Sequence, residues 1–308
     1  MVMKKYILSL VVFTLSLSLQ AGVLRVNNYD GSAPYSNVED AINAAAEGDT
    51  IMLDGSYYSY GDVTLDKRVV LMGNGYYLIE NGIATESITD AIVDKITINA
   101  EGTVIKSLRV SSDVTGGWIK IFAPKVIIQR CYIGNNDSGV VLYSGADNCI
   151  IHQCYVRGPI GNGNSYYATF NHQITNNMLP RLNIRSVQNS YIAYNTSWSG
   201  YGEVVYSCMG NKIEKNHVYN ENFGDGDSYN AYVDNFTTGA LFKDAQTVAD
   251  FKNTELPEGA KGKGCFAGDD PFVISGVPAG PMIEKLDVPT SAEAGGTMKV
   301  SVKIGEAK

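Results

Sequence analysis

The sequence predicts an all-β fold: a right-handed, single-stranded parallel β-helix with a short N-terminal capping helix and a C-terminal β-hairpin. One six-residue phrase recurs along the chain: a branched apolar residue, two variable residues, a Leu, Cys or Asn, one variable residue and usually another apolar residue. Its copies begin at Ile105, Ile128, Ile151, Ile174, Ile192 and Ile213, which lie 23, 23, 23, 18 and 21 positions apart. A period near twenty with the same inward residues is typical of a solenoid, in which each turn buries its face against its neighbours. The composition agrees, because charged residues make up only 18% while Gly (32) and Tyr (20) are abundant, as in β-rich extracellular proteins.

Residues 1–21 have the pattern of a secretory signal peptide. Lys4 and Lys5 precede an apolar stretch, and Leu19-Gln20-Ala21 ends in a small residue that suits signal peptidase. We expect this segment to be removed, which would place the protein in the periplasm, at the cell surface or outside the cell, with no membrane span after cleavage.

The charge balance separates two classes of partner. The formal net charge is −8, and cleavage would remove two lysines and no acids, so it would become −10. An acidic chain without a run of Lys or Arg argues against a nucleic-acid partner. An anionic polysaccharide stays compatible, because a local basic strip can lie on an acidic body.

Residues 22–60 are expected to form the N-terminal segment and cap. Residues 37–46 form a short amphipathic helix, with Asn37 or Ser36 as its N-cap and Gly48 just past its end. Its apolar side would cover the open first turn of the coil, which every solenoid needs. Residues 50–53 and 69–72 then read as the first strands.

The parallel β-helix itself is assigned to residues 61–275. A second apolar strand precedes each phrase, at 96–98, 119–121, 140–142, 182–184 and 204–206. Strand, turn, strand, tight turn and strand in each repeat predict three parallel sheets wound as a coil. The fourth phrase residue changes along the chain, from Leu108 through Cys131 and Cys154 to Asn177, Asn195 and Asn216. We expect these asparagines to point inward, bonding to the backbone and to each other at the turn.

Five cysteines raise the question of disulfides. Cys131 and Cys154 occupy the same phrase position in adjacent turns, roughly 4.8 Å apart, which a disulfide tolerates. Parallel stacking, however, points both thiols the same way, so we favour buried free thiols. No pairing is predicted for Cys149, Cys208 and Cys265.

Residues 276–308 are expected to form a β-hairpin. Met282–Val288 and Thr297–Ile304 alternate between apolar and polar residues and flank Ala294-Gly-Gly296. We expect the hairpin to pack on the coil or to pair with a protein partner.

The phrases, the asparagines and two further segments carry a family resemblance. Ala41–Ile51 (AINAAAEGDTI) followed by Gly55–Tyr57, together with Gly239–Asp244, complete a pattern that resembles the pectate-lyase-like right-handed parallel β-helix superfamily over roughly residues 36–275. Members include pectate and alginate lyases, polygalacturonases, pectin methylesterases and non-catalytic surface proteins. The resemblance therefore implies the fold and leaves the activity to be argued from the site.

The resemblance also implies where a site would lie, on the first strand of each turn. The outward residues predicted there are Lys120, Tyr143, Tyr166, Asn183, Arg185 and Glu203. Lys120 and Arg185 are the candidate catalytic bases of a uronate lyase, which needs a cation against the sugar carboxylate and a base for the adjacent proton. Tyr143, Tyr166, Asn183 and Glu203 are the candidate substrate-binding residues. The alternative is an ordinary solvated sheet face.

Calcium is the one cofactor that the sequence offers. Asp225, Asp227 and Asn230 place oxygen ligands around Gly226, a pattern that suits Ca²⁺. The full EF-hand spacing and its closing Glu are absent, so a solvated turn is the alternative.

Two functions stay open from the sequence. The first is a secreted protein that binds or processes polysaccharide through the outward face of one sheet, and as an enzyme it would be a polysaccharide lyase or a glycoside hydrolase. The second is a non-catalytic cell-surface or structural protein. The absence of a repeated Asp pair and of a compact acidic cluster favours no catalysis. Convergence of Lys120, Tyr143, Tyr166 and Arg185 in one groove would favour an enzyme.

Overall fold

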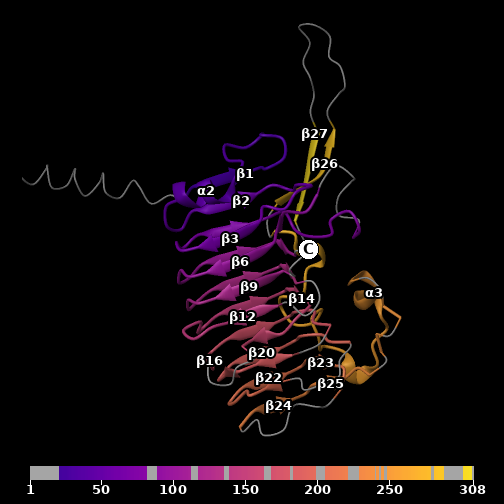
Figure 1. Cartoon of the computed structure of the whole chain (residues 1–308). Coiled ribbons are helices and arrows are strands. Elements are labelled where there is room, and N and C mark those ends of the chain that lie inside the picture. Colours follow the sequence, from indigo (N-terminus) through magenta and orange to yellow (C-terminus); the bar gives the residue numbers. More distant parts are fainter. Residues whose placement is uncertain are drawn as a thin grey trace, which may run out of the picture.

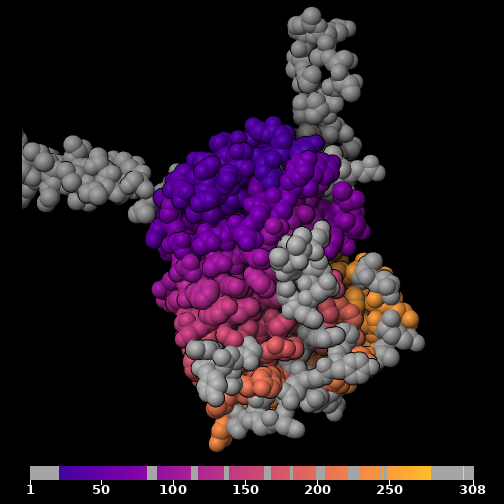
Figure 2. All heavy atoms as spheres, in the orientation of Figure 1, coloured from indigo at the N-terminus to yellow at the C-terminus, as the bar shows by residue number. Residues whose placement is uncertain are grey.

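Stacked strands wind into a parallel β-helix whose axis runs the length of the molecule (Figure 1). The computed structural model describes residues 21–81, 89–111, 117–134, 139–162, 168–180, 183–198, 205–220, 229–239, 241–242, 244–245, 248–278, 281–287 and 301–306. In the space-filling view, the coil forms one elongated body from its indigo N-terminal turns to its orange C-terminal turns (Figure 2).

Three parallel sheets make up the coil. Within the described residues the long sheet has ten strands, in the order β1 (Val23–Val26), β2 (Thr50–Leu53), β4 (Val70–Met72), β7 (Val104–Lys106), β10 (Ile127–Gln129), β13 (Ile150–His152), β17 (Gln173–Thr175), β20 (Tyr191–Ala193), β22 (Lys212–Glu214) and β24 (Ala231–Val233). The seven-stranded sheet contains β3 (Asp62–Leu65), β6 (Lys95–Ile98), β9 (Trp118–Ile121), β12 (Val140–Leu142), β15 (Ile160–Gly161), β18 (Ile184–Arg185) and β21 (Val205–Tyr206). The third sheet contains β5 (Ile92–Val93), β8 (Arg109–Val110), β11 (Tyr132–Ile133) and β14 (Tyr155–Val156). The C-terminal turns of the coil also contain two short parallel pairs: β16 (Thr169–Phe170) with β19 (Val187–Gln188), and β23 (His217–Val218) with β25 (Phe236–Thr237). The long sheet thus begins at β1, inside the segment that the sequence assigned to the cap.

The leading residues of the phrase form one continuous column in the core. Ile105, Ile128 and Ile151 are paired in register from turn to turn and have no exposed surface. The same register carries through Ile174 and Ile192. Burying each of these side chains stabilises the coil by about 1.5–3 kcal/mol.

The third phrase position explains how the chain turns inward at the fourth. Arg130, Gln153, Asn176 and Tyr194 all have φ near +55°, in the left-handed region. One residue in this conformation bends the chain so that the next side chain points into the core. A non-glycine residue costs roughly 1–2 kcal/mol there, and the hydrogen bonds that follow hold the turn.

The inward asparagines form the hydrogen-bonded ladder that the sequence predicted. The Asn195 side-chain oxygen accepts hydrogen bonds from the Asn177 backbone N–H and side-chain amide, both at 3.0 Å, and its own amide donates to the Ile174 carbonyl at 2.9 Å. Asn216 and Asn235 repeat this arrangement. The ladder satisfies backbone groups that the turn would otherwise leave unpaired at a cost of about 1–3 kcal/mol each.

A second ladder, which the sequence analysis missed, runs through the turn before the long sheet. The Cys149 N–H donates to His172 Nδ1 (3.2 Å), and the His172 N–H donates to Ser190 Oγ (2.8 Å). Asn211 and Asn230 continue it through the same kind of contact. Different residue types thus fill equivalent positions, which hides this ladder from a search for repeated letters.

All five cysteines are buried thiols outside any disulfide. This was favoured from the sequence for Cys131 and Cys154, and no pairing was predicted for Cys149, Cys208 and Cys265. Cys131 and Cys154 stack inside the coil between β10 and β11 and between β13 and β14, and the Cys154 thiol faces the His152 carbonyl at 3.2 Å.

The predicted cap is the helix α2 (Val38–Ala44). Asn37 is its N-cap, and its side chain accepts a hydrogen bond from the Glu39 N–H at 2.7 Å. Val38 and Ala41 are buried in the main core, and Ile42 packs against it. The helix therefore closes the N-terminal end of the coil as expected.

After β25 the chain leaves the coil and returns along its outside, over the third sheet. This return segment, residues 241–278, contains α3 (Val248–Asn253), η1 (Glu258–Ala260) and η2 (Ile274–Gly276). Its Phe242, Phe251 and Phe272 pack with Tyr132 and Met178 of the coil in a second apolar cluster. The sequence had assigned most of this segment to the coil.

The C-terminal hairpin is present as an antiparallel pair. β26 (Pro281–Asp287) pairs with β27 (Ser301–Glu306), with a register shift between Ile283 and Lys285. Across the described residues, no helix is long and apolar enough to cross a membrane.

Candidate functional site

The outward face of the seven-stranded sheet carries two of the predicted cations in one column. Lys120 pairs with Val141 of the next strand, and Arg185 pairs with Gly161 on one side and Tyr206 on the other. Because β12 pairs with β15 in the same register, Lys120 and Arg185 lie in line, three strands apart. At the usual strand spacing this separates their Cα atoms by about 14 Å.

Trp118 holds two lysines on this face. Lys120 Nζ lies 4.7 Å from the centre of the Trp118 ring, and Lys95 Nζ lies 5.2 Å from it. Both distances fall within the range of a cation–π contact. Lys95 also faces Asp62 of β3 at 3.8 Å. The tryptophan thus orders a pair of cations on neighbouring strands.

Tyr143 lies one column away from Lys120. It follows β12 directly and stacks on Phe122, with ring centroids 4.2 Å apart and an angle of 13° between the planes. The two rings stack face to face along the coil axis, which leaves their edges towards solvent. Phe122 is 43% exposed.

Asn183 and Tyr206 surround Arg185. The Arg185 Nε–H donates to Asn183 Oδ1 at 2.9 Å, which fixes the guanidinium direction. Tyr206, the outward residue of β21, is 48% exposed beside it. Tyr206 is not among the site residues predicted from the sequence. Tyr166 and Glu203 lie outside the described residues and stay predictions.

Beyond Asp62 of β3, the described charges on this face are all positive. Among the described strands from β6 to β21, the outward side chains include Lys95, Lys120 and Arg185 and no carboxylate. Lys120 and Arg185 lie in one column and Lys95 in the next, and we call these three residues the basic strip. On a chain with a net charge of −8, it is a local positive surface of the kind that attracts anions.

One cavity of the described residues, of about 500 Å³, lies between α2 and β3 and is lined by residues such as Ile42, Tyr60 and Lys67. Lys95, Lys120 and Arg185 do not line it. The Lys67 ammonium there donates to the Ile42, Asn43 and Ala45 carbonyls at the end of α2. The register places Lys120 and Arg185 three strands apart and Tyr143 in the neighbouring column, so these residues are spread along the sheet face.

The calcium prediction is supported by no geometry in the described residues. Asp225 and Asp227 lie outside them. Asn230 belongs to the second ladder, where its Oδ1 accepts from the Asn211 N–H (2.9 Å) and side-chain amide (3.1 Å). In the part of the chain that the structure covers, no group of three or more His, Cys, Asp or Glu side chains could hold a metal ion.

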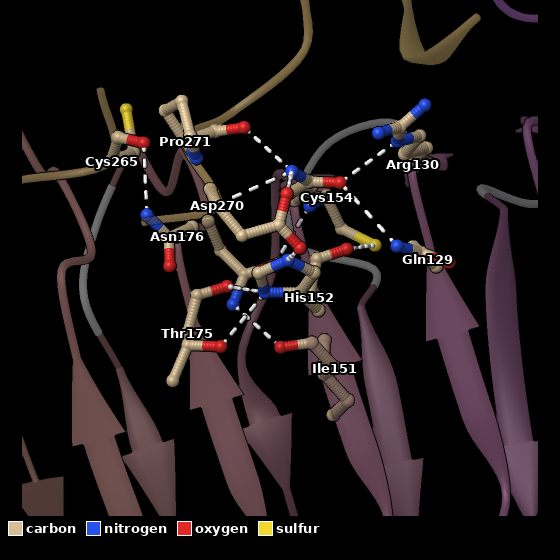
Figure 3. A network of polar contacts seen from close by, with 12 residues as sticks. Gln129, Arg130, Ile151, His152, Cys154, Thr175, Asn176, Cys265, Asp270 and Pro271 are labelled. Carbon is tan, nitrogen blue, oxygen red and sulfur yellow. Dashed lines mark hydrogen bonds and ion pairs between the residues drawn. The ribbon is translucent and has the colours of Figure 1, made fainter. Parts of the chain in front are cut away.

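A polar network between the coil and the return segment was not found from the sequence. His152, on the outward face of β13, contacts Asp270 Oδ2 through Nε2 at 2.9 Å and Thr175 Oγ1 through Nδ1 at 2.8 Å (Figure 3). The side-chain amide of Gln153 donates to Asp270 Oδ1 (2.7 Å) and to the Pro271 carbonyl (2.6 Å). These contacts fasten residues 270–271 to the coil.

The Thr175–His152–Asp270 series has the order of groups found in hydrolase triads. His152 Nδ1 lies 2.8 Å from the Thr175 hydroxyl and 3.1 Å from the Thr175 carbonyl oxygen, so the hydroxyl is not its only partner. Asp270 is held by Gln153 as well as by His152, and we therefore assign these contacts to attaching residues 270–271 to the coil. His152, Gln153 and Thr175 occupy the variable second and third phrase positions.

Buried titratable groups elsewhere are held in their uncharged forms. Burial lowers the pKa of His172 to about 4, and it lowers that of His217 as well. Burial raises the pKa of the Cys149 thiol to about 11 and that of Cys265 to about 12. Neither thiol is therefore a thiolate nucleophile at neutral pH.

Comparisons with known proteins leave the activity open. No protein-family model matches the chain, and no similar sequence was found among curated proteins. The solved structure of the pectin methylesterase PemA from Erwinia chrysanthemi aligns with 79% of this chain and 97% of its own, at 13% sequence identity and a TM-score of 0.41. A likeness at this level says nothing of activity, and the fold rests on the sheet topology described above.

Proposed function

We propose that this protein binds an anionic polysaccharide along the basic strip and does not cleave it. The observation that carries the proposal is the placement of three cations on one open sheet face: Lys120 and Arg185 lie in one column and Lys95 lies in the next. Among the described strands from β6 to β21 this face has no outward carboxylate, and Asp62 of β3, at its N-terminal end, pairs with Lys95. The strip runs parallel to the coil axis, which suits a linear chain with repeated negative groups.

The neighbouring side chains suit a sugar polymer. Tyr206 is exposed beside Arg185, and Phe122 and Tyr143 turn ring edges to solvent next to Lys120. Aromatic rings offer apolar area to the C–H surfaces of sugars, while amides such as Asn183 accept and donate hydrogen bonds to hydroxyl groups. The combination favours an acidic glycan over a simple anion.

The spacing argues against cleavage by the predicted residues. A lyase needs its base and its charge-stabilising group around one sugar, within hydrogen-bond reach of the reacting atoms. The Cα atoms of Lys120 and Arg185 are about 14 Å apart along the sheet. Their head groups contact their sequence neighbours Trp118 and Asn183 and are not brought together around one carbon. A hydrolase would need a pair of carboxyl groups across the bond, and the described strip has none.

Binding to a panel of soluble polysaccharides tests the proposal. Polygalacturonate, alginate and a glycosaminoglycan are titrated by calorimetry, with a neutral dextran for comparison. We expect binding to at least one acidic polymer, no binding to dextran, and affinity roughly tenfold weaker in the double variant K120Q/R185Q, because two exposed charge contacts are lost.

The matched control is K125Q/K261Q, which removes the same net charge from exposed lysines that pair with Glu101 and Glu258 away from the strip. Its affinity should equal that of the wild type. Equal weakening in both double variants would show that net charge and not the strip is responsible. No binding to any acidic polymer would contradict the proposal and favour a structural role. Release of unsaturated uronates, seen as ultraviolet absorbance, would contradict the absence of cleavage.

A further inference from the structure

Among the described residues, Gly22 is the first whose backbone hydrogen-bonds to another part of the fold. Its carbonyl accepts a hydrogen bond from the Thr50 N–H at 2.8 Å, and the paired register of β1 with β2 begins at the next residue, where Val23 lies opposite Thr50. Ala21 is exposed. The sheet therefore begins at the Gly22 carbonyl.

The nitrogen of Gly22 faces a carboxylate. It donates to Asp49 Oδ1 at 2.6 Å, while Asp49 Oδ2 accepts the Ala46 N–H at 2.8 Å. Asp49 lies between α2 and β2, so the contact joins the start of the sheet to the turn that follows the cap. These two backbone donors lower the pKa of the Asp49 carboxyl, which keeps it ionised at neutral pH.

Space at this contact favours glycine. A Cβ atom at position 22 would lie 3.3 Å from Asp49 Oδ1, which is closer than ordinary van der Waals contact. Because glycine has no Cβ, the Gly22 nitrogen can approach the Asp49 carboxylate closely.

The sequence marks the same peptide bond for another reason. Residues 1–21 have the pattern of a signal peptide that ends at Ala21, a small residue of the type signal peptidase accepts. Two independent features, the peptidase pattern before the bond and the carboxylate after it, therefore coincide at Ala21–Gly22.

We propose that signal peptidase hydrolyses the Ala21–Gly22 bond and that the new α-ammonium of Gly22 pairs with Asp49. One water molecule is consumed: the C–N bond breaks, the carbonyl carbon of Ala21 gains the oxygen and leaves as a carboxylate, and the Gly22 nitrogen gains protons to become an ammonium. Cleavage replaces a neutral amide with one N–H by a cation with three N–H donors. The nitrogen already lies within hydrogen-bond distance of the Asp49 carboxylate. Processing thus adds an ion pair that ties the sheet to the cap.

The two cationic side chains near this contact have other partners. Lys67 donates to the carbonyls at the end of α2, and Arg68 faces Glu47 at 3.9 Å. Neither replaces the ammonium as the direct partner of Asp49 Oδ1.

The first measurement is the N-terminus of the exported protein. The full chain is expressed in a bacterium with a secretory pathway, and the protein recovered from the periplasm or medium is examined by intact mass and N-terminal sequencing. We expect a single species that begins at Gly22. A retained leader, or a chain that begins at another residue, would overturn the proposal.

The second measurement tests the ion pair through its coupling to the free amine. The melting temperature (Tm) is compared for wild type and D49N, in the exported protein and in a cytoplasmic form with Met, Gln20 and Ala21 before Gly22, where the Gly22 nitrogen is an amide. We expect D49N to lower Tm more in the exported form. D30N is the control, because Asp30 likewise accepts a backbone N–H, that of Ser32, but faces no chain terminus. Equal losses for D49N in both forms would refute the pairing.

The pH dependence gives an independent readout. An ammonium beside a carboxylate has a folded pKa above its unfolded value of about 7.7–8.0. Its stabilisation is complete below that unfolded value and is lost as pH rises through the folded pKa. The extra effect of D49N in the exported form should therefore disappear in alkaline solution, and an effect that persists there would contradict the assignment.

Discussion

His172 shows how one position of a ladder can make the coil sensitive to acid. Its Nδ1 accepts the Cys149 N–H, and burial lowers its pKa from an ordinary 6.5 to about 4. A proton on Nδ1 would break this hydrogen bond and place a charge in the core. The folded state therefore disfavours protonation, and stability should be full above pH 6.5 and fall as the pH drops towards 4.

We predict that H172N flattens this acid dependence. Asn211 and Asn230 fill equivalent ladder positions, so an asparagine oxygen can accept the Cys149 N–H without titrating. A shift from 6.5 to about 4 corresponds to about 3 kcal/mol of stability lost between those pH values. Urea unfolding at pH 7.5 and pH 4 measures it: the wild type should lose about that much more than the variant. The same loss in both proteins would exclude His172 as the source.

At this scale the sequence was informative where a residue type repeats. Asn177, Asn195 and Asn216 were expected inward, and they form the first ladder. The left-handed backbone at Arg130 and Gln153 was not foreseen, because those positions carry no glycine and vary in type. Because the coil geometry imposes the positive φ at these positions, no particular residue type is required there and the sequence does not reveal it.

At the scale of elements, the return segment depends on two close backbone approaches. A Cβ on Gly276 would overlap the Arg130 carbonyl oxygen and come 2.6 Å from the Tyr76 ring, and a Cβ on Gly264 would come 2.6 Å from Thr196 Oγ1. Between these points, His152 and Gln153 hold Asp270. The segment is thus fixed along its path over the third sheet.

We predict that G276A loosens the return segment and that G262A does not. Both glycines have positive φ (57° and 73°), so alanine costs roughly 1–2 kcal/mol of backbone strain at either position. At Gly262 a Cβ would meet nothing within 4 Å, whereas at Gly276 it meets backbone. We expect G276A to lose about 1–3 kcal/mol more and to be cut by protease within residues 241–278 while the coil stays intact. Equal resistance of both variants would contradict this account of the contact.

Elements were predictable where burial follows a period. The cap helix and the core strands were expected, because their apolar residues repeat at helical or alternating spacing. The return segment packs irregularly placed residues, such as Phe242, Phe251 and Phe272, on the outside of the coil. No period marks such contacts, so residues 61–275 were assigned to the coil as a whole.

At the scale of the whole molecule, part of the candidate site could be predicted because it follows the alternation of residues along each strand. Alternation along each strand placed Lys120, Tyr143 and Arg185 on the outward face, as observed. Alignment between strands depends on loop lengths, which vary from turn to turn. Tyr143 consequently stacks beside Phe122 in the neighbouring column, and Trp118, which orders two lysines, was overlooked.

The central claim is that the basic strip is the surface that meets an acidic polysaccharide, and protection of lysines from acylation tests it most directly. The protein is labelled with and without the acidic polymer that binds it, and each lysine is quantified by mass spectrometry. We predict that labelling of Lys95 and Lys120 falls in the complex while that of Lys125 and Lys261 does not change. Unchanged labelling of Lys95 and Lys120 in a saturated complex would contradict the claim and place the polysaccharide on another face.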